Sequence, residues 1–319
     1  MHRLFDALRC RFDRSGEQRS RVEAGELASD HLPRHDFIAR VEGPAVGHLE
    51  RNFQERWNYL VGLQVAWSEH ASEVAEPPAT PPIRGGVQVQ VVRTMPEPFN
   101  ERGILDVHLR ALRTARRLIY IEDQYFLSTH ISNAIADTVR AFPGIYVIAV
   151  TLRSQADDLF AGGWSREAFD RIARRLPGFT LYVLLAHDVD HEGRSQLVEV
   201  DNHAKLMIVD DLFLTVGSAN INDRSFEFEG EINPAVVDPA QVKQARLDIW
   251  REHLADDPRL TGDIDADVAV WREHARDNLA GLTAAGQAPR SQGGHELEGL
   301  SPAKPNSGFA LVWNSPSGG

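Results

Sequence analysis

The sequence has little cysteine and no long hydrophobic run. Its 319 residues include one cysteine, Cys10, which excludes an internal disulfide framework and a thiolate metal cluster. The longest apolar runs, residues 145–150 and 181–186, are far shorter than the ~20 residues of a membrane-spanning helix. Lys and Arg number 34 against 46 Asp and Glu, and this net charge of −12 gives no electrostatic basis for general nucleic-acid binding.

The N-terminal residues are charged and lack the apolar core of a signal peptide. The sequence therefore predicts a cytoplasmic protein, or a secreted one if the true N-terminus lies upstream. A hydrophobic fraction of 42% with 25% charged residues is typical of a globular protein. The length suggests two domains, or one large domain with extensions.

Strand and helix patterns alternate beyond a proline-rich stretch at 76–82, which we interpret as a linker. This alternation predicts an α/β fold in which a mixed sheet is flanked by helices. The predicted strands cover 36–41, 87–92, 118–121, 145–152, 179–185, 206–209 and 212–216, and the predicted helices cover 46–60, 104–117, 130–142, 164–176 and 239–254. We expect a complete domain at 83–256, a helical extension at 257–284 and a flexible tail at 285–319, where Gly, Pro and Ser dominate.

The most informative stretch begins at His203 and has the spacing H-x-K-x4-D-x6-G-S-x-N. Side chains alternate along a strand, so His203 and Lys205 are predicted to share a face. The same parity joins Ser218 and Asn220 if the chain is extended there, although Gly-Ser-x-Asn also suits a turn. Imidazole, ammonium, hydroxyl and amide groups together suit a phosphodiester, because fixed donors neutralise its oxygens while the imidazole attacks or protonates.

This spacing resembles the signature of the phospholipase D superfamily. Further segments are similar to the two-motif phospholipases D, which the chain resembles more than single-motif nucleases over residues 33–255. These segments are 89–96, 120–126, 220–225 and 249–254. The resemblance implies a phospholipase D-like α/β fold and a two-step phosphodiesterase reaction through a phosphohistidine, with no cofactor or metal. The implied substrate is a glycerophospholipid at a membrane surface, which would be hydrolysed or transphosphatidylated, and no nucleic-acid partner is expected.

The resemblance also assigns roles to individual residues. His203 would act as general acid and then general base, and Glu231 would orient its ring. Lys205, Ser218 and Asn220 would bind phosphate. Two further assignments complete the set: Asp210 would be structural, and Gln124 would line the cleft.

The first motif of the family is absent, since none of the 13 histidines forms a second H-x-K. Residues 35–58 resemble the family's segment immediately after that motif, so Asp36 would be the acidic partner of the missing nucleophile, unless His35 and Asp36 are only a surface pair. Residues 1–75 are therefore predicted to be the remnant of an N-terminal half in a truncated or mis-started chain.

Three functional alternatives arise from the missing motif. In the first, two copies form a homodimer through the complete domain, and each contributes His203 and Lys205. In the second, the chain is a catalytically dead half. In the third, it is a nuclease-like phosphodiesterase, which the negative charge disfavours. His187, Asp188, Asp190 and His191 could suggest a metal site, but we interpret them as a solvated loop.

Overall fold

A computed structural model describes residues 34–63, 71–75, 82–83, 86–151, 179–189, 195–284, 297–298 and 310–314. Its helices are α2 (Ala45–Gly62), α3 (Gly103–Thr114), α4 (Thr129–Ala141), α6 (Asp223–Glu227), α7 (Pro239–His253) and α8 (Ile264–Ala284). Its strands are β1 (Arg34–His35), β2 (Val89–Met95), β3 (Glu101–Arg102), β4 (Leu118–Asp123), β5 (Tyr146–Val150), β6 (Phe179–Val189), β7 (Ser195–Glu199), β8 (Asp201–Asn202), β9 (Lys205–Val209), β10 (Phe213–Val216), β11 (Glu231–Val237), β12 (Leu297–Glu298) and β13 (Ala310–Asn314).

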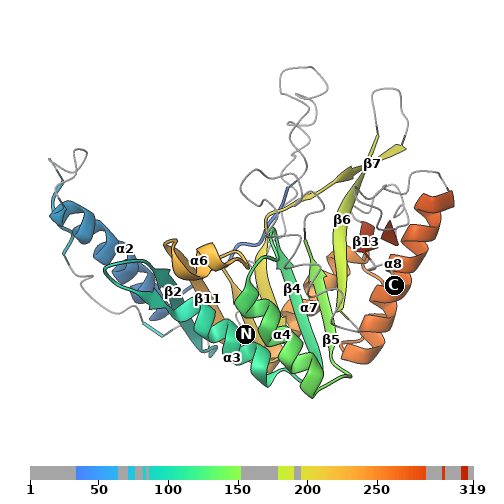
Figure 1. The fold of residues 1–319 in the computed structure, drawn as a ribbon, viewed down its shortest axis with the longest axis horizontal. Helices are drawn as coiled ribbons and strands as arrows, with labels where there is room; N and C mark the ends of the chain where they lie inside the picture. The colour runs from blue at the N-terminus through green and yellow to red at the C-terminus, as the bar shows by residue number, and fades with distance from the viewer. Residues whose placement is uncertain are drawn as a thin grey trace.

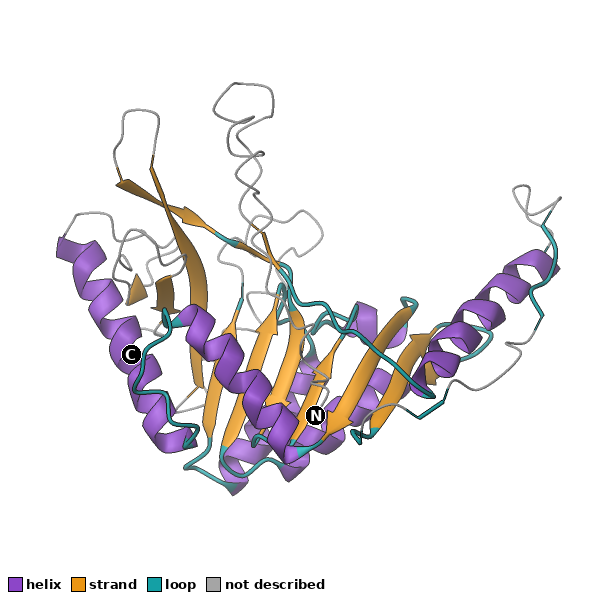
Figure 2. Cartoon of the chain, turned by 180° about the vertical axis from the view of Figure 1, so that it is seen from behind, coloured by secondary structure: helices purple, strands orange, loops and turns teal. Residues whose placement is uncertain are grey.

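The strands form one large mixed sheet, in the order β12-β13-β6-β5-β4-β9-β10-β11-β2-β3, with β7 also paired to β6. The pairs β4–β5 and β5–β6 are parallel, and the other pairs along this order are antiparallel. Helices cover both faces: α3 and α4 lie on one face, and α7 and α8 lie on the other (Figures 1 and 2). The predicted α/β class with a helix-flanked mixed sheet is therefore confirmed.

Side chains alternate between the two faces of the sheet along the central strands, so each face has its own hydrophobic core. In β4, Leu118 and Tyr120 belong to the cluster that contains Trp250 and Trp271 of α7 and α8. The residue between them, Ile119, belongs to the opposite cluster, which contains apolar residues of α3 and α4. A strand buried on both sides explains why residues 118–121 are continuously apolar.

The element bounds differ from the prediction in two informative places. The predicted strand at 36–41 is wrong: β1 covers Arg34–His35 and pairs in parallel with β8, whereas 36–41 is irregular. Within residues 285–319, which were predicted to be a flexible tail, β12 and β13 join the sheet, and β13 pairs with β6. A short strand forms wherever its backbone N–H and C=O groups meet the unpaired edge of a sheet. Amino-acid composition does not reveal such a meeting. The predicted helix at 164–176 and the linker at 76–81 lie outside the described residues.

The α2 helix lies at the far end of the molecule, beyond β2 (Figure 1). It confirms the predicted helix at 46–60, but none of its residues is fully buried. Among the described residues, no helix is both long enough and apolar enough to cross a bilayer.

Candidate functional site

The imidazole of His203 is held by Asp36, from a segment 167 residues earlier in the chain. Nδ1 of His203 lies 2.8 Å from Oδ2 of Asp36, and the amide of Phe37 donates to Oδ1 of the same carboxylate at 2.9 Å. Burial alone would raise the pKa of Asp36, but the bonds from His203 and Phe37 outweigh it, so this pKa lies below its usual range. The His203 side chain is 34% exposed, which leaves its ring open to solvent.

The backbone of His203 is held by the same early segment. Parallel pairing sets His35 beside Asn202, and the amide of His203 donates to the carbonyl of His35 at 2.8 Å. His203 therefore precedes β9, which begins at Lys205, and the buried Ala204 separates them. The ammonium of Lys205 lies 2.6 Å from the carbonyl oxygen of His203, so the structure brings these two residues together.

Asp123 of β4 lies opposite Lys205 in the antiparallel register, and no role was predicted for it. Its carboxylate accepts hydrogen bonds from the amides of Tyr125 and Ile221 at 2.8 and 3.0 Å. Burial raises the pKa of Asp123 to about 8, although the nearby ammonium of Lys205 opposes this shift. Asp123 thus links the loop after β4 to the segment that contains Asn220.

Gly217 permits a close approach between two strands at this edge. A Cβ atom there would lie 2.3 Å from Oδ1 of Asn233 and 2.4 Å from the carbonyl oxygen of Ile232. The amide of Ser218 donates to the Ile232 carbonyl at 3.2 Å, and Ser218 is exposed. In the described part of the chain, Oδ1 of Asn220 is buried without a hydrogen-bond partner. The spacing G-S-x-N therefore places a hydroxyl and an amide with an unpaired oxygen beside the start of β9.

The two acidic residues lie elsewhere than the resemblance implied. Glu231 begins β11 and accepts a hydrogen bond from the hydroxyl of Ser218 at 2.5 Å. Burial raises the pKa of Glu231, although the bond from Ser218 opposes it. Glu231 was predicted to orient the ring of His203, whereas in the structure Nδ1 of that ring contacts Asp36. Asp36 was expected to serve a missing histidine, but the β1–β8 pairing brings it to this one.

The structure also gives the positions of Gln124 and Asp210, the two remaining residues with a predicted role. The amide of Gln124 donates to the carbonyl of Ala204 at 3.3 Å, so the loop after β4 crosses beside His203. Asp210 lies at the other end of β9, where its carboxylate accepts the amides of Arg116, Arg117 and Leu118 at 2.7–2.8 Å. This arrangement is structural, as the resemblance implied for Asp210.

A buried cluster behind the site was not predicted. Glu122 lies between His35 and His253, and all three side chains are fully buried. They could offer three ligand atoms to a metal ion, all within 4.8 Å of one another. The signal in the sequence was an acidic pair that ends an apolar strand, since a buried carboxylate needs partners. Of the other suggested metal ligands, the side chains of His187 and Asp188 are not described, and Asp190 and His191 lie outside the described residues.

The fold and this edge together define an α/β domain that presents a carboxylate-held imidazole next to an ammonium group. Residues 109–252 match the family model described as cardiolipin synthase, PLD-like domain. The chain is 28% identical over 281 residues to phospholipase D A of Dictyostelium discoideum. This alignment covers 72% of this chain and 22% of the relative. Phospholipase D alpha 3 of Arabidopsis thaliana is 24% identical, with 81% of this chain and 44% of the relative covered.

These matches confirm the resemblance to the phospholipase D superfamily. The chain spans less than half the length of these two relatives. Among solved structures, a phosphatidylserine synthase from Haemophilus influenzae is similar, with 15% identity, a TM-score of 0.45, and coverage of 69% of this chain and 54% of that chain.

Proposed function

We propose that the chain is a phospholipase D-type phosphodiesterase that hydrolyses or transphosphatidylates glycerophospholipids at a membrane surface through His203. The observation that carries this proposal is the 2.8 Å contact between Nδ1 of His203 and the carboxylate of Asp36. This contact favours the proton on Nδ1, so that Nε2 of the neutral ring can attack phosphorus. It also stabilises the cationic ring, which can protonate a leaving alcohol through Nε2.

The neighbouring groups suit the charge of a phosphodiester. Lys205 would neutralise a non-bridging oxygen with the positive charge of its ammonium, which lies 2.6 Å from the backbone carbonyl oxygen of His203. Asn220 would donate a hydrogen bond to the same group, from its amide nitrogen to a phosphate oxygen. Ser218 would donate to this group once its hydroxyl proton turns away from Glu231, which accepts that proton in the structure.

The phosphohistidine mechanism needs two imidazoles, and we propose that a second copy of the chain supplies the other. Nε2 of one His203 attacks phosphorus and forms the N–P bond, while the bond to the leaving alcohol breaks. The second His203, as the imidazolium, gives its proton to that alcohol. The same ring then takes a proton from water or from an acceptor alcohol, which displaces the first histidine and releases phosphatidic acid or the new phospholipid.

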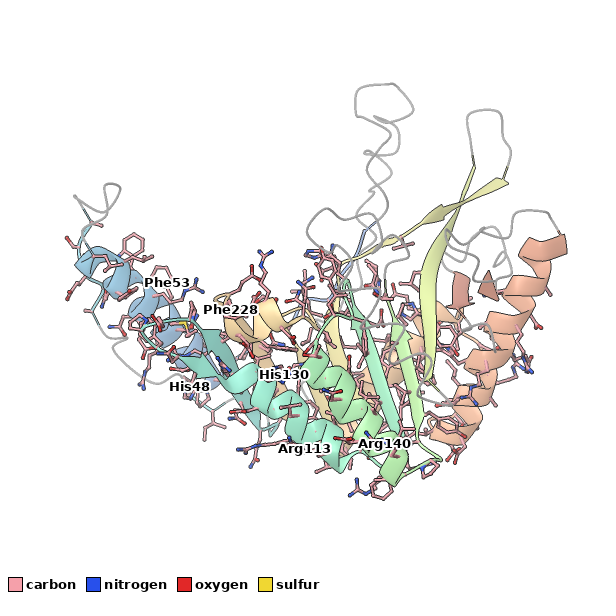
Figure 3. The ribbon with its side chains drawn as sticks, in the orientation of Figure 1. His48, Phe53, Arg113, His130, Arg140 and Phe228 are labelled. Atoms are coloured by element: carbon pink, nitrogen blue, oxygen red, sulfur yellow. The ribbon has the colours of Figure 1, made fainter. Side chains whose placement is uncertain are left out.

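The test is release of choline from phosphatidylcholine vesicles by the purified chain, with the oligomeric state measured by sedimentation in parallel. Active chain should be dimeric, and specific activity should fall on dilution through the dissociation range. His203→Ala should lower the rate by about 10²- to 10⁴-fold. His48→Ala is the matched control, because His48 lies on α2, a separate element from β9 (Figure 3), and should change the rate less than twofold.

Other outcomes would overturn the proposal. A folded dimer without turnover would identify a catalytically dead half. Cleavage of DNA or RNA without lipid turnover would identify a nuclease-like phosphodiesterase. Turnover by a strictly monomeric chain would contradict the shared site.

A further inference from the structure

Three buried side chains from distant segments meet directly behind His203. Nε2 of His253, at the end of α7, lies 2.9 Å from Oε1 of Glu122. Nε2 of His35 lies 3.0 Å from the other oxygen of the same carboxylate. The hydroxyl of Tyr120 also donates to Glu122, so this carboxylate is bound on several sides. Such a network restricts the rotation of each ring as long as Glu122 stays ionised.

His35 connects this cluster to the site through the backbone. It precedes Asp36, and its carbonyl accepts the amide of His203 at 2.8 Å. Its ring is fixed by Glu122 and by an edge contact with Phe37, whose centroid lies 4.9 Å away. The residues on both sides of Asp36 are therefore buried and anchored, whereas Asp36 itself is half-buried and reaches Nδ1 of His203.

Charge explains why the cluster is stable in the core. Two histidines at equal burial behave differently: burial lowers the pKa of His108 to about 4, whereas the pKa of His253 is raised despite its burial. The difference is Glu122, because the ring of His108 binds only a backbone carbonyl, that of Ile104 at 2.8 Å. Glu122 and His253 form a buried ion pair, and buried charges persist when they are paired and hydrogen-bonded.

The same three residues could also be considered as metal ligands. Both histidine nitrogens lie within hydrogen-bond range of the carboxylate, at 2.9 and 3.0 Å. The polar atoms that a metal would need are thus already paired with one another. Direct hydrogen bonding therefore accounts for these distances, and the zinc content of the native protein distinguishes it from a metal site.

We propose that Glu122, His253 and His35 form a positioning network that presents Asp36 to Nδ1 of His203 and thereby fixes the proton on that nitrogen. The proposal rests on the function proposed for His203, but it concerns the state of the ring and can be measured without turnover. None of the three touches substrate in this scheme, so they are positioning residues.

The test uses Glu122→Gln, which keeps the shape of the side chain but cannot accept two histidine donors on its two terminal atoms. Imidazole ¹⁵N spectra of histidine-labelled protein at alkaline pH report which nitrogen of His203 carries the proton, with assignment by His203→Gln. The native ring should be protonated at Nδ1, and the variant should show a mixture of tautomers. The variant should lose about 10- to 100-fold in kcat, with KM within twofold.

His108→Gln is the matched control, because His108 is equally buried but lies outside the network. It should destabilise the fold while it leaves the His203 spectrum and kcat within twofold of the native values. If Glu122→Gln does not fold, His253→Gln decides, since it removes the ion pair and retains an amide donor.

A folded variant with an unchanged His203 tautomer would overturn the proposal. So would stoichiometric zinc in the native protein that is lost in His253→Gln, since the cluster would then be a metal site. If the spectra change as expected but no protein turns over phosphatidylcholine, the positioning network stands and the proposed function fails.

Discussion

Both ends of the central strands β4 and β9 contain buried charge, but the two ends arrange it differently. At the end near His203, an anion lies at the centre: Glu122 is held by His35 and His253. At the opposite end, a cation lies at the centre. The guanidinium of Arg246 on α7 binds Asp211 and Asp267 at 2.6 and 2.9 Å.

The origin of the side chains makes the difference clear. The Glu122 cluster joins the strand edge to the segment that carries Asp36, so its geometry reaches the proposed catalytic ring. The Arg246 cluster joins α7 and α8 to the turn between β9 and β10, where Asp210 and Asp211 both have a φ of 55°. One end therefore supports the site, and the other fixes helices to the sheet. Four predictions test this division.

The largest effect is expected for Asp36→Asn at the site end. A neutral amide cannot stabilise the cationic ring of His203, so kcat should fall by about 10²- to 10⁴-fold. The free energy of unfolding should change by less than about 1 kcal/mol, because Asp36 and His203 are partly exposed. Phosphatidylcholine turnover and urea unfolding measure the two quantities. A kcat equal to that of the native chain would show that Asp36 has no role in catalysis.

Arg246→Met should have the largest effect on stability at the opposite end. It leaves two buried carboxylates without their cation, which should cost about 3–5 kcal/mol of unfolding free energy. Arg251→Met on the same helix is the control, since its ion pair with Asp248 is exposed and should contribute less than about 1 kcal/mol. At denaturant concentrations below the unfolding transition, His203 of Arg246→Met should carry its proton on Nδ1, as in the native chain. A changed tautomer would show that the two ends are not independent.

Asp210→Ala should destabilise the protein by about 2–3 kcal/mol, because three backbone amides lose a charged acceptor. Asp210→Asn should lose less, since an amide oxygen still accepts and asparagine tolerates a positive φ. Chemical denaturation measures both. Equal losses in the two variants would contradict the assigned role of the carboxylate.

The smallest effect concerns pH. Burial alone would raise the pKa of Glu122, but charge from His253 and His35 outweighs it and lowers this pKa. The contribution of Glu122 to the free energy of unfolding is therefore fully present above pH 4.5, its ordinary pKa. This contribution is lost as the pH falls through the lower pKa of the folded state. The pKa of His253 is raised, so its contribution to the free energy of unfolding is fully present below pH 6.5, its ordinary pKa. This contribution is lost as the pH rises through the higher pKa of the folded state.

The network should therefore stabilise the fold most between these two values, with slopes of up to about 1.4 kcal/mol per pH unit outside them. Unfolding free energies across pH measure this profile. The profile should flatten in His253→Gln but not in Arg251→Met; identical profiles would count against a buried ion pair.

Much of the fold was predictable because its signals are local. Residues 118–121 of β4 are continuously apolar and buried on both faces. Helix α7 begins with Pro239 after Asp238, whose carboxylate caps two amides. The edge containing His203 and Lys205 was predictable from spacing. The short β1 was misplaced by two residues, since two residues that pair with a distant strand leave no periodicity.

The pairing of the acids was not predictable for a different reason. The resemblance assigned both Asp36 and Glu231 as acidic partners of a motif histidine. Spacing along the chain does not indicate which of the two carboxylates reaches the ring of His203. The β1–β8 pairing decides this, through a contact across 167 residues. Likewise, the sequence shows Glu122 and His253 but does not show that they meet in the core.

The separation of these residues along the chain also orders events during synthesis. Asp36 leaves the ribosome long before His203, and Glu122 is made before His253, its partner 131 residues later. A nascent chain that ends before residue 253 would therefore carry the Glu122 carboxylate without its second histidine. Under the proposed positioning network, His253 is therefore the last of these residues to be synthesised.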